Sequence, residues 1–219
     1  MLPRRVRTDG FIDPCIPTLA AKPPTGPGWV HEIKHDGYRL IVRRDGAAVR
    51  LFTRHGHEWT DRYPSIAGRA AMLRARSFTL DGEAVVCGAD GVALFDALHR
   101  RHEATDAILY AFDLLELNGK DLGPMPLGER RTKLARLLAR ASSGIVFNEH
   151  TDEDGAVVFR HACKLGLEGI VSKRLTAPYR SGPCRDWIKV KNPDSPAMGA
   201  HGRLCGDAPA IGGSRRRWG

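Results

Sequence analysis

The sequence predicts an α+β domain in which antiparallel β-sheets are flanked by a few helices. Apolar and polar residues alternate along several segments, as in strands with one buried face. Asp-Gly and Asn-Gly pairs stand next to these segments, and such pairs favour tight turns between antiparallel strands. Only two segments show the wider apolar spacing of an amphipathic helix. Strands joined by short turns, with helices added, indicate this fold class.

The first hairpin is predicted around residues 38–54. Tyr38, Leu40 and Val42 alternate with residues of the opposite face, Asp45-Gly46 provides the turn, and alternation resumes over 49–54. Further strands are expected on either side of a second Asp-Gly pair within 77–95, over 107–117 before Asn118-Gly119, over 167–174 and over 187–191. "DGE" at 81–83 can be read by itself as a turn.

Two helices are predicted, over residues 127–140 and 154–165. The first has a leucine stripe opposite many Arg and Lys residues: Leu127, Leu134, Leu137 and Leu138. The second follows the acidic residues 152–154, which favour a helix N-terminus, and ends before Gly166. Its inward residues are expected to be Val157, Val158, Ala162 and Leu165.

One folded domain is expected over residues 29–193. Residues 1–28 are rich in Pro and Gly and predict an extended lead-in. Residues 194–219 form a basic tail without periodicity, which we expect to be disordered. No segment is apolar and long enough to predict a signal peptide or a membrane span, so no membrane association is expected.

The charge balance favours a polyanionic partner. Lys and Arg number 34 against 25 Asp and Glu, which gives a formal net charge of +9 and a pI near 9.7. The five cysteines are scattered and include no C-x-x-C pair, which argues against a zinc ribbon and against a disulfide framework. Free cysteines are typical of a reducing, cytoplasmic protein.

Six short segments stand in a characteristic order along the chain. They are "EIKHDGYR" at 32–39, "FTRHG" at 52–56, "LDGEAVV" at 80–86, "YAFDLL" at 110–115, "EGIVSKR" at 168–174 and "WIKVK" at 187–191. Together they resemble the covalent nucleotidyltransferase superfamily of ATP-dependent DNA ligases, RNA ligases and mRNA capping enzymes. The resemblance covers about residues 13–193 and is closest to the ligase domain of bacterial end-joining ligases.

The resemblance implies a nucleotidyltransferase (adenylation) fold and the activity of an ATP-dependent DNA ligase. Lys34 is the implied catalytic residue, which forms lysyl-AMP before AMP passes to a DNA 5′-phosphate and the nick is sealed in DNA repair and recombination. ATP and Mg²⁺ (or Mn²⁺) are the implied cofactors. The implied partners are nicked or broken duplex DNA and an end-joining protein.

The nucleotide site is implied by matching residues in the same segments. Glu32 would recognise adenine, Phe112 would stack on it, and Arg39 would hold the ribose side of AMP. For Phe112 the other interpretation is a core aromatic of an apolar strand. Arg54 would contact either AMP or the 5′-phosphate of a nick.

The metal and phosphate contacts are implied in the same way. Glu168 would bind the divalent metal, and Glu83 would contact the ribose and assist the metal. Lys189 and Lys191 share one strand face and would grip the α-phosphate. Lys173 and Arg174 would either touch the nucleotide or be solvated, and the sequence leaves both possibilities open.

The chemistry explains why cations should surround Lys34. An amine attacks phosphorus only when it is neutral, whereas a free lysine has a pKa of about 10.4. Lys189 and Lys191 are the cations expected to favour the neutral form. In a continuous strand, Glu32 and Asp36 would share a face with Lys34 and form ion pairs. A break in the strand at Gly37 would avoid this.

Two other functions are compatible with the sequence. Only 28 residues follow Lys191, too few for the OB-fold domain that continues typical ligases, so no OB-fold is expected here. A catalytically impaired nucleic-acid-binding remnant is therefore one alternative. An RNA ligase or capping-type nucleotidyltransferase is the other, although Glu32 within "EIKHDGYR" favours ATP and ligation over capping.

Overall fold

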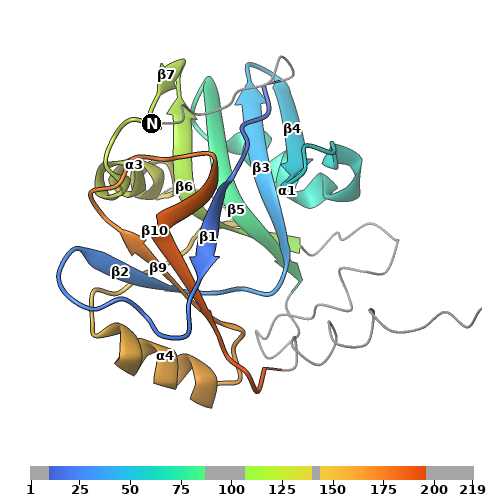
Figure 1. Cartoon of the computed structure of the whole chain (residues 1–219). Coiled ribbons are helices and arrows are strands. Elements are labelled where there is room, and N and C mark those ends of the chain that lie inside the picture. The colour runs from blue at the N-terminus through green and yellow to red at the C-terminus, as the bar shows by residue number, and fades with distance from the viewer. Residues whose placement is uncertain (1–9, 87–106, 140–143, 196–219) are drawn as a thin grey trace, which may run out of the picture.

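Two β-sheets form the frame of the molecule (Figure 1), a computed structural model that describes residues 10–86, 107–139 and 144–195. The larger sheet has the order β4-β3-β5-β6-β7, with β8 paired to β6. The smaller has the order β1-β10-β9-β2. The strands of the larger sheet are β3 (Tyr38–Asp45), β4 (Ala48–Thr53), β5 (Ser77–Val86), β6 (Ala107–Leu117), β7 (Lys120–Asp121) and β8 (Ile145–Phe147). Those of the smaller are β1 (Cys15–Leu19), β2 (Trp29–Ile33), β9 (Gly169–Arg174) and β10 (Gly182–Lys191).

The larger sheet contains the predicted hairpin. β3 and β4 pair antiparallel up to Asp45 and Ala48, and Gly46 turns the chain with φ 60. β6 ends before Asn118 and Gly119, whose positive φ values of 50 and 83 suit the predicted turn into β7. Both predictions are confirmed.

The interpretation of residues 81–83 as a turn is wrong. β5 runs from Ser77 to Val86 through Asp81 and Gly82, and pairs with β3 on one side and β6 on the other. The register to β6 shifts between Asp81 and Gly82, so this pair marks a bulge in a continuous strand. The other half of the predicted 77–95 hairpin lies outside the described residues.

The lead-in belongs partly to the domain. Residues 15–19 are extended, as predicted, but they form β1, which pairs parallel with β10 at the edge of the smaller sheet. Phe11, Ile12 and Cys15 are each only 1% exposed. The register shifts between Pro17 and Thr18, and a proline is tolerated at such an edge because it removes a single donor. The predicted tail lies outside the described residues from 196 onward.

Both predicted helices are present, as α3 (Leu127–Leu138) and α4 (Gly155–Lys164). The Asp154 side chain accepts hydrogen bonds from the Ala156 and Val157 amides and so caps α4. Gly166 follows the helix with φ 69. Leu165 does not point inward as predicted, because it lies beyond the last helical turn and is 74% exposed.

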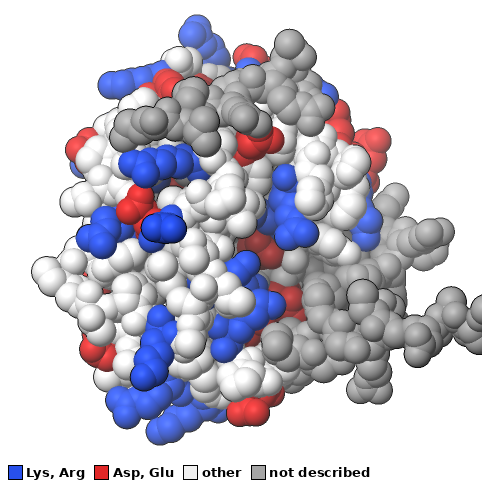
Figure 2. All heavy atoms as spheres, in the orientation of Figure 1, with Lys and Arg blue, Asp and Glu red and all other residues white. Residues whose placement is uncertain are grey.

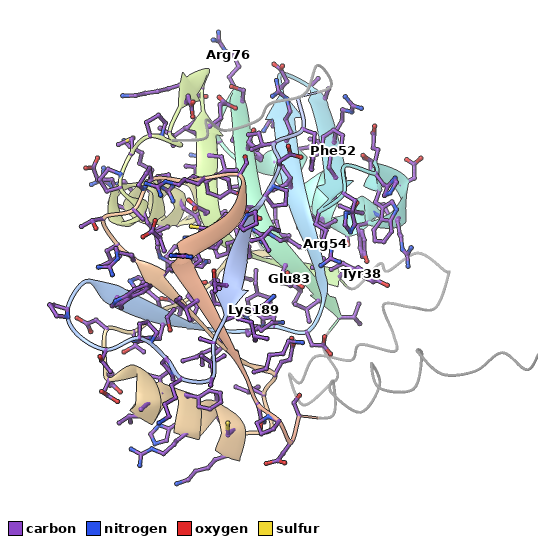
Figure 3. All side chains as sticks on the ribbon, in the orientation of Figure 1. Tyr38, Phe52, Arg54, Arg76, Glu83 and Lys189 are labelled. Atoms are coloured by element: carbon purple, nitrogen blue, oxygen red, sulfur yellow. The ribbon has the colours of Figure 1, made fainter. Side chains whose placement is uncertain are left out.

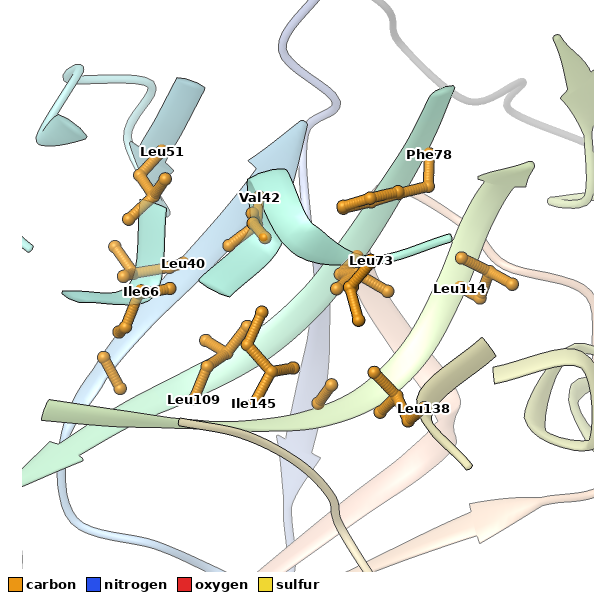
Figure 4. Close-up of a cluster of buried hydrophobic side chains, with 14 of the residues drawn as sticks. Leu40, Val42, Leu51, Ile66, Leu73, Phe78, Leu109, Leu114, Leu138 and Ile145 are labelled. Atoms are coloured by element: carbon orange, nitrogen blue, oxygen red, sulfur yellow. The ribbon is translucent and has the colours of Figure 1, made fainter. Parts of the chain in front are cut away.

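An unpredicted helix, α1 (Pro64–Met72), follows the short 3₁₀ turn η1 (Thr60–Arg62) and completes the main core. The helices α1 and α3 contact the larger sheet, and α4 contacts β2 and β9 of the smaller sheet. Leucines, Val42 and Phe78 from β3 to β6 pack against Ile66 of α1, Leu138 of α3 and Ile145 of β8, as Figure 4 shows. Within the described ranges, no helix combines the length and hydrophobicity that a membrane crossing requires.

Candidate active site

A cleft of about 540 Å³ lies between the two sheets. All the site residues predicted from the sequence line it: Glu32, Lys34, Arg39, Arg54, Glu83, Phe112, Glu168, Lys189 and Lys191. In Figure 3, Arg54, Glu83 and Lys189 converge on this region from the end of β4, from β5 and from β10, respectively. The fold therefore brings segments far apart in sequence to one place.

Lys34 stands just beyond the end of β2, at the seam between the sheets. β2 ends at Ile33, and the Lys34 amide donates a 3.0 Å hydrogen bond to the Gly169 carbonyl of β9. The Lys34 Nζ donates to Glu168 Oε2, and the other oxygen of this carboxylate lies 3.6 Å from Lys191 Nζ. The Lys34 side chain remains 22% exposed, so a substrate can approach the amine.

The predicted break in the strand does occur before Gly37. A Cβ at position 37 would lie 2.1 Å from the Ala84 carbonyl oxygen of β5, closer than real atoms approach. Glycine therefore allows the chain to pass directly over β5 as it leaves Lys34 and enters β3. Glu32 points to other cations, so the predicted alternative of a Glu32–Lys34 strand ion pair is wrong.

Cations gather around Lys34. Burial lowers the pKa of Lys189, and the positive charges of Lys34, Lys191 and Arg54 lower it further. These four side chains line the same cleft and therefore repel one another. A polyanion such as a nucleoside triphosphate would relieve this repulsion.

Two carboxyl groups face the cations across the cleft. Burial raises the pKa of Glu83 to about 7; Lys34 and Arg39 lower it, and Glu168 raises it. A divalent cation near Glu83 and Glu168 would stabilise both as carboxylates. Among the described residues, no group of three or more carboxylate, His or Cys side chains could hold a metal alone. Glu83 and Glu168 could hold Mg²⁺, which commonly takes one or two carboxylates together with substrate phosphates.

Glu32 is buried in a network of donors. Its carboxylate accepts from Arg131, from Lys173 Nζ at 2.7 Å and from Asn148 Nδ2 at 3.0 Å. Lys173 is 1% exposed and lies 4.0 Å from the centroid of the Phe112 ring, so it is not solvated.

Arg174, by contrast, points away from the cleft. Its side chain is 44% exposed, lies 3.7 Å from Asp186 and covers the ring of Trp29. Of the two basic residues that the sequence left open, Lys173 lines the cleft and Arg174 is a surface residue.

Arg39 is held by its neighbours on the cleft wall. Its Nε and Nη2 donate to the two oxygens of buried Asp81 at 2.9 and 2.6 Å, and Nη1 donates to the Cys15 carbonyl. Burial alone would lower the pKa of Arg39, but Asp81 raises it above its usual range. The guanidinium thereby links β1, β3 and β5 beside the cleft.

Phe112 is a core aromatic, as one of the two sequence-based interpretations held, and its stacking on adenine stays a prediction. It is 8% exposed and packs edge-on against Trp187, with ring centroids 5.9 Å apart, in a cluster between the sheets. It also lines the cleft.

Several residues in the cleft or supporting it are missing from the sequence-based prediction. Arg131 was assigned to the polar side of α3, yet it is 2% exposed and holds Glu32. Its neighbour Arg130 is fully buried against Asp113. The available signal was Asp113 within an apolar strand, because a buried carboxylate requires a donor from elsewhere. Asn148 and His35 carried no comparable signal.

The chain also matches a family model. The model of the ATP dependent DNA ligase domain matches residues 19–191, which include Lys34 and both lysines of β10. The chain belongs to this family. The resemblance inferred from the six segments and the predicted α+β fold are thus confirmed.

Individual members of the ligase family show how much of each is shared. The multifunctional non-homologous end joining protein LigD of Pseudomonas aeruginosa is 42% identical over 185 residues, or 83% of this chain and 22% of that protein. The SPbeta prophage-derived DNA ligase-like protein LigB of Bacillus subtilis is 30% identical over 189 residues, covering 84% of this chain and 68% of LigB. This chain spans about a fifth of the length of the LigD relatives.

A solved ligase domain has the same fold. The ligase domain of LigD from M. tuberculosis superposes with a TM-score of 0.71 at 34% identity, covering 81% of this chain and 60% of that one. A mycobacterial DNA ligase D complexed with ATP and MES gives a TM-score of 0.70 at 36% identity, covering 81% and 59%.

Proposed function

We propose that this chain is the catalytic core of a DNA ligase that forms lysyl-AMP from ATP and transfers AMP to a DNA 5′-phosphate. The supporting observation is the placement of Lys34 in a cleft beside Glu168, Lys189 and Lys191, within a chain of the ligase family. A partly exposed lysine among cations and carboxylates suits covalent catalysis on a phosphate.

In the first transfer, Lys34 Nζ attacks the α-phosphorus of ATP. A P–N bond forms, the P–O bond to the leaving pyrophosphate breaks, and the proton that the amine loses passes to solvent, to which the Lys34 side chain is 22% exposed. Glu168 orients Nζ through the hydrogen bond that it accepts. The expectation that Lys189 and Lys191 favour the neutral amine remains a prediction.

Lys189, Lys191 and Arg54 would bind the phosphates. Their ammonium and guanidinium groups line the cleft together, so they can offset the charge that builds up on the phosphate oxygens. They need little reorganisation for this, because β10 and the end of β4 already hold them near Lys34.

Glu83 and Glu168 would hold a Mg²⁺ ion (or Mn²⁺) together with phosphate oxygens. Bound there, the metal supplies positive charge that polarises the phosphate. Until a cation or a ribose hydroxyl arrives, the buried Glu83 carboxyl has an elevated pKa of about 7.

The nucleoside would lie toward Phe112. Phe112 lines the cleft and would contact adenine there, and Glu32 lies near this region through the Lys173 contact. Arg39 already donates hydrogen bonds to Asp81 and to the Cys15 carbonyl. We therefore propose that it stabilises the wall of the cleft on the ribose side of AMP.

Duplex DNA with a nick or break would be the second substrate. The net charge of +9 suits a phosphate backbone, and in Figure 2 basic side chains gather around the middle of the visible face with acidic ones between them. We place the protein in the cytoplasm with an end-joining partner. The free cysteines among the described residues, Cys15, Cys163 and Cys184, agree with a reducing compartment.

Intact mass spectrometry tests the first step. After incubation with ATP and Mg²⁺ the wild-type chain should gain one AMP, and Lys34→Ala should gain none. Lys164→Ala, which removes an exposed lysine of α4, is the matched control and should behave as wild type. Absence of an adduct, with nicked DNA also present, would contradict the proposal and favour a nucleic-acid-binding remnant.

Substrate choice separates the remaining alternatives. GTP in place of ATP should give little adduct, whereas a capping-type enzyme would prefer it. Sealing of a nicked DNA duplex should then exceed sealing of the same nick with RNA strands. The reverse preference would point to an RNA ligase.

A further inference from the structure

The segment that carries Lys34 is anchored to both sheets. On one side the Lys34 amide binds the Gly169 carbonyl of β9. On the other, the chain at Gly37 passes directly over Ala84 of β5. Between these two points stands His35, a residue that the sequence did not assign to the site.

His35 packs into the larger sheet. Its ring stacks on Tyr110 of β6, with centroids 4.0 Å apart and 23° between the planes. Its Nε2 lies 2.9 Å from Asn148 Oδ1, just after β8. His35, the residue next to the nucleophile, is therefore attached to β6 and to the end of β8.

Asn148 connects this anchor to Glu32. Its Nδ2 donates to Glu32 Oε2 at 3.0 Å. Its main chain is held as well, since the amide donates to Ala111 and the carbonyl accepts from Arg131. Asn148 is 4% exposed, so its side chain has little freedom to turn away.

Hydrogen bonds in this network run in one direction, from His35 to Asn148 and from Asn148 to Glu32. A carboxylate held by Arg131 and Lys173 offers only acceptors, so the Asn148 amide nitrogen must face Glu32. The amide oxygen then faces His35, and Nε2 must carry the hydrogen. Burial lowers the pKa of His35, which favours the neutral ring, and the orientation of Asn148 places its proton on Nε2.

We propose that His35 and Asn148 are positioning residues for the adenylation reaction, holding the Lys34 segment and Glu32 in one register through the bond from His35 Nε2 to Asn148 Oδ1. This inference rests on the proposed function. A displacement of the nucleophile by about 1 Å can cost on the order of 100-fold in rate, so an anchor one residue away affects catalysis directly.

Two substitutions of His35 separate the bond from the ring. His35→Phe keeps the aromatic stack on Tyr110 and removes the donor, whereas His35→Gln removes the ring and keeps a donor at the same distance along the side chain. Asn148→Leu removes the acceptor at similar volume. His161→Gln, at an exposed position of α4, is the matched control.

The measured quantities are the single-turnover rate of AMP adduct formation at saturating ATP and the ATP concentration that gives half of it. His35→Phe should lower the saturated rate roughly 10- to 100-fold with little change in the half-saturating concentration. Asn148→Leu also removes the donor to Glu32, so it should lower the rate at least as much and raise the half-saturating concentration. His35→Gln should recover most of the rate. The double variant should be no slower than Asn148→Leu, because that single variant already removes the bond that His35→Phe removes.

The outcomes are distinguishable from failure of the proposed function. If the wild-type chain forms no adduct, the function fails and the inference fails with it. If the wild type reacts while His35→Phe and Asn148→Leu react equally fast, only the inference is overturned. Long-range ¹H–¹⁵N NMR of the full chain should also show His35 protonated on Nε2; a hydrogen on Nδ1 alone would overturn the inference independently of activity.

Discussion

At the residue scale, the cleft environment makes ionisation of the Glu83 carboxyl unfavourable. Its carboxyl lies on β5 and interacts electrostatically with the cations Lys34 and Arg39 and with the acidic groups of Glu168 and Asp81. Burial is the main cause that raises its pKa from 4.5 to about 7. The folded protein therefore holds this proton more tightly than the unfolded chain does.

Glu83→Gln should make the protein more stable at high pH. A raised carboxyl pKa gives stability that is present at low pH and lost as the pH rises from about 4.5 through 7. The glutamine variant does not lose this stability as the pH rises, so at pH 8 its unfolding temperature should exceed that of the wild type by roughly a few degrees. The difference should shrink toward pH 5.

Thermal unfolding across that pH range checks the prediction without added metal. The same variant should form the AMP adduct more slowly, because it loses the carboxylate assigned to metal and ribose. A glutamine variant whose unfolding temperature follows the wild type at every pH would show that Glu83 has an ordinary pKa.

At the element scale, the crossing from β2 to β3 decides where the nucleophile lies. The two strands belong to different sheets, and the chain between them passes over the β5 backbone at Gly37. A side chain at position 37 would push this connection away from β5, and Lys34 and His35 would move with it.

Gly37→Ala should abolish most adduct formation. The added Cβ would lie 2.1 Å from a main-chain oxygen, which no side-chain rotation can relieve. We expect the rate of AMP adduct formation to fall by about 100-fold or more, since the reacting amine is displaced. Intact mass spectrometry over time measures it.

The matched control is Gly68→Ala on the exposed face of α1. A Cβ there meets nothing within 4 Å, and alanine favours a helix, so this variant should gain about 0.5–1 kcal/mol in stability and keep its activity. Equal adduct rates for Gly37→Ala and wild type would contradict the close passage over β5.

At the scale of the whole molecule, the positive charge should govern DNA binding. The chain carries a net charge of +9, and Arg54 follows β4 at the cleft wall. Binding to a phosphate backbone weakens as salt concentration rises, with a slope set by the number of phosphate contacts. The role of Arg54 can therefore be read from salt dependence.

Arg54→Gln should reduce the salt dependence of binding to nicked duplex DNA. If Arg54 contacts the 5′-phosphate, the slope of log affinity against log salt should fall in magnitude by about one. Fluorescence anisotropy at several NaCl concentrations measures this slope. An unchanged slope, together with weaker adduct formation from ATP, would assign Arg54 to AMP instead.

The sequence predicted what depends on local chemistry. Alternation from Tyr38 indicated a strand because successive side chains point to opposite faces, and Asn118-Gly119 indicated a turn because both residues tolerate positive φ. The order of short segments around Lys34 and Lys189 predicted the family. These features need no knowledge of distant partners.

Tertiary structure alone decided which charges pair and which residues are buried. Glu32 meets Arg131 and Asn148 from 99 and 116 residues away, and no local pattern places such residues together. Cys15–Leu19 forms a strand because it pairs with the edge of β10, which is distant in the sequence. The partners of Lys34, Glu32 and His35 come from distant parts of the chain, so only the tertiary packing of the two sheets around the cleft identifies them.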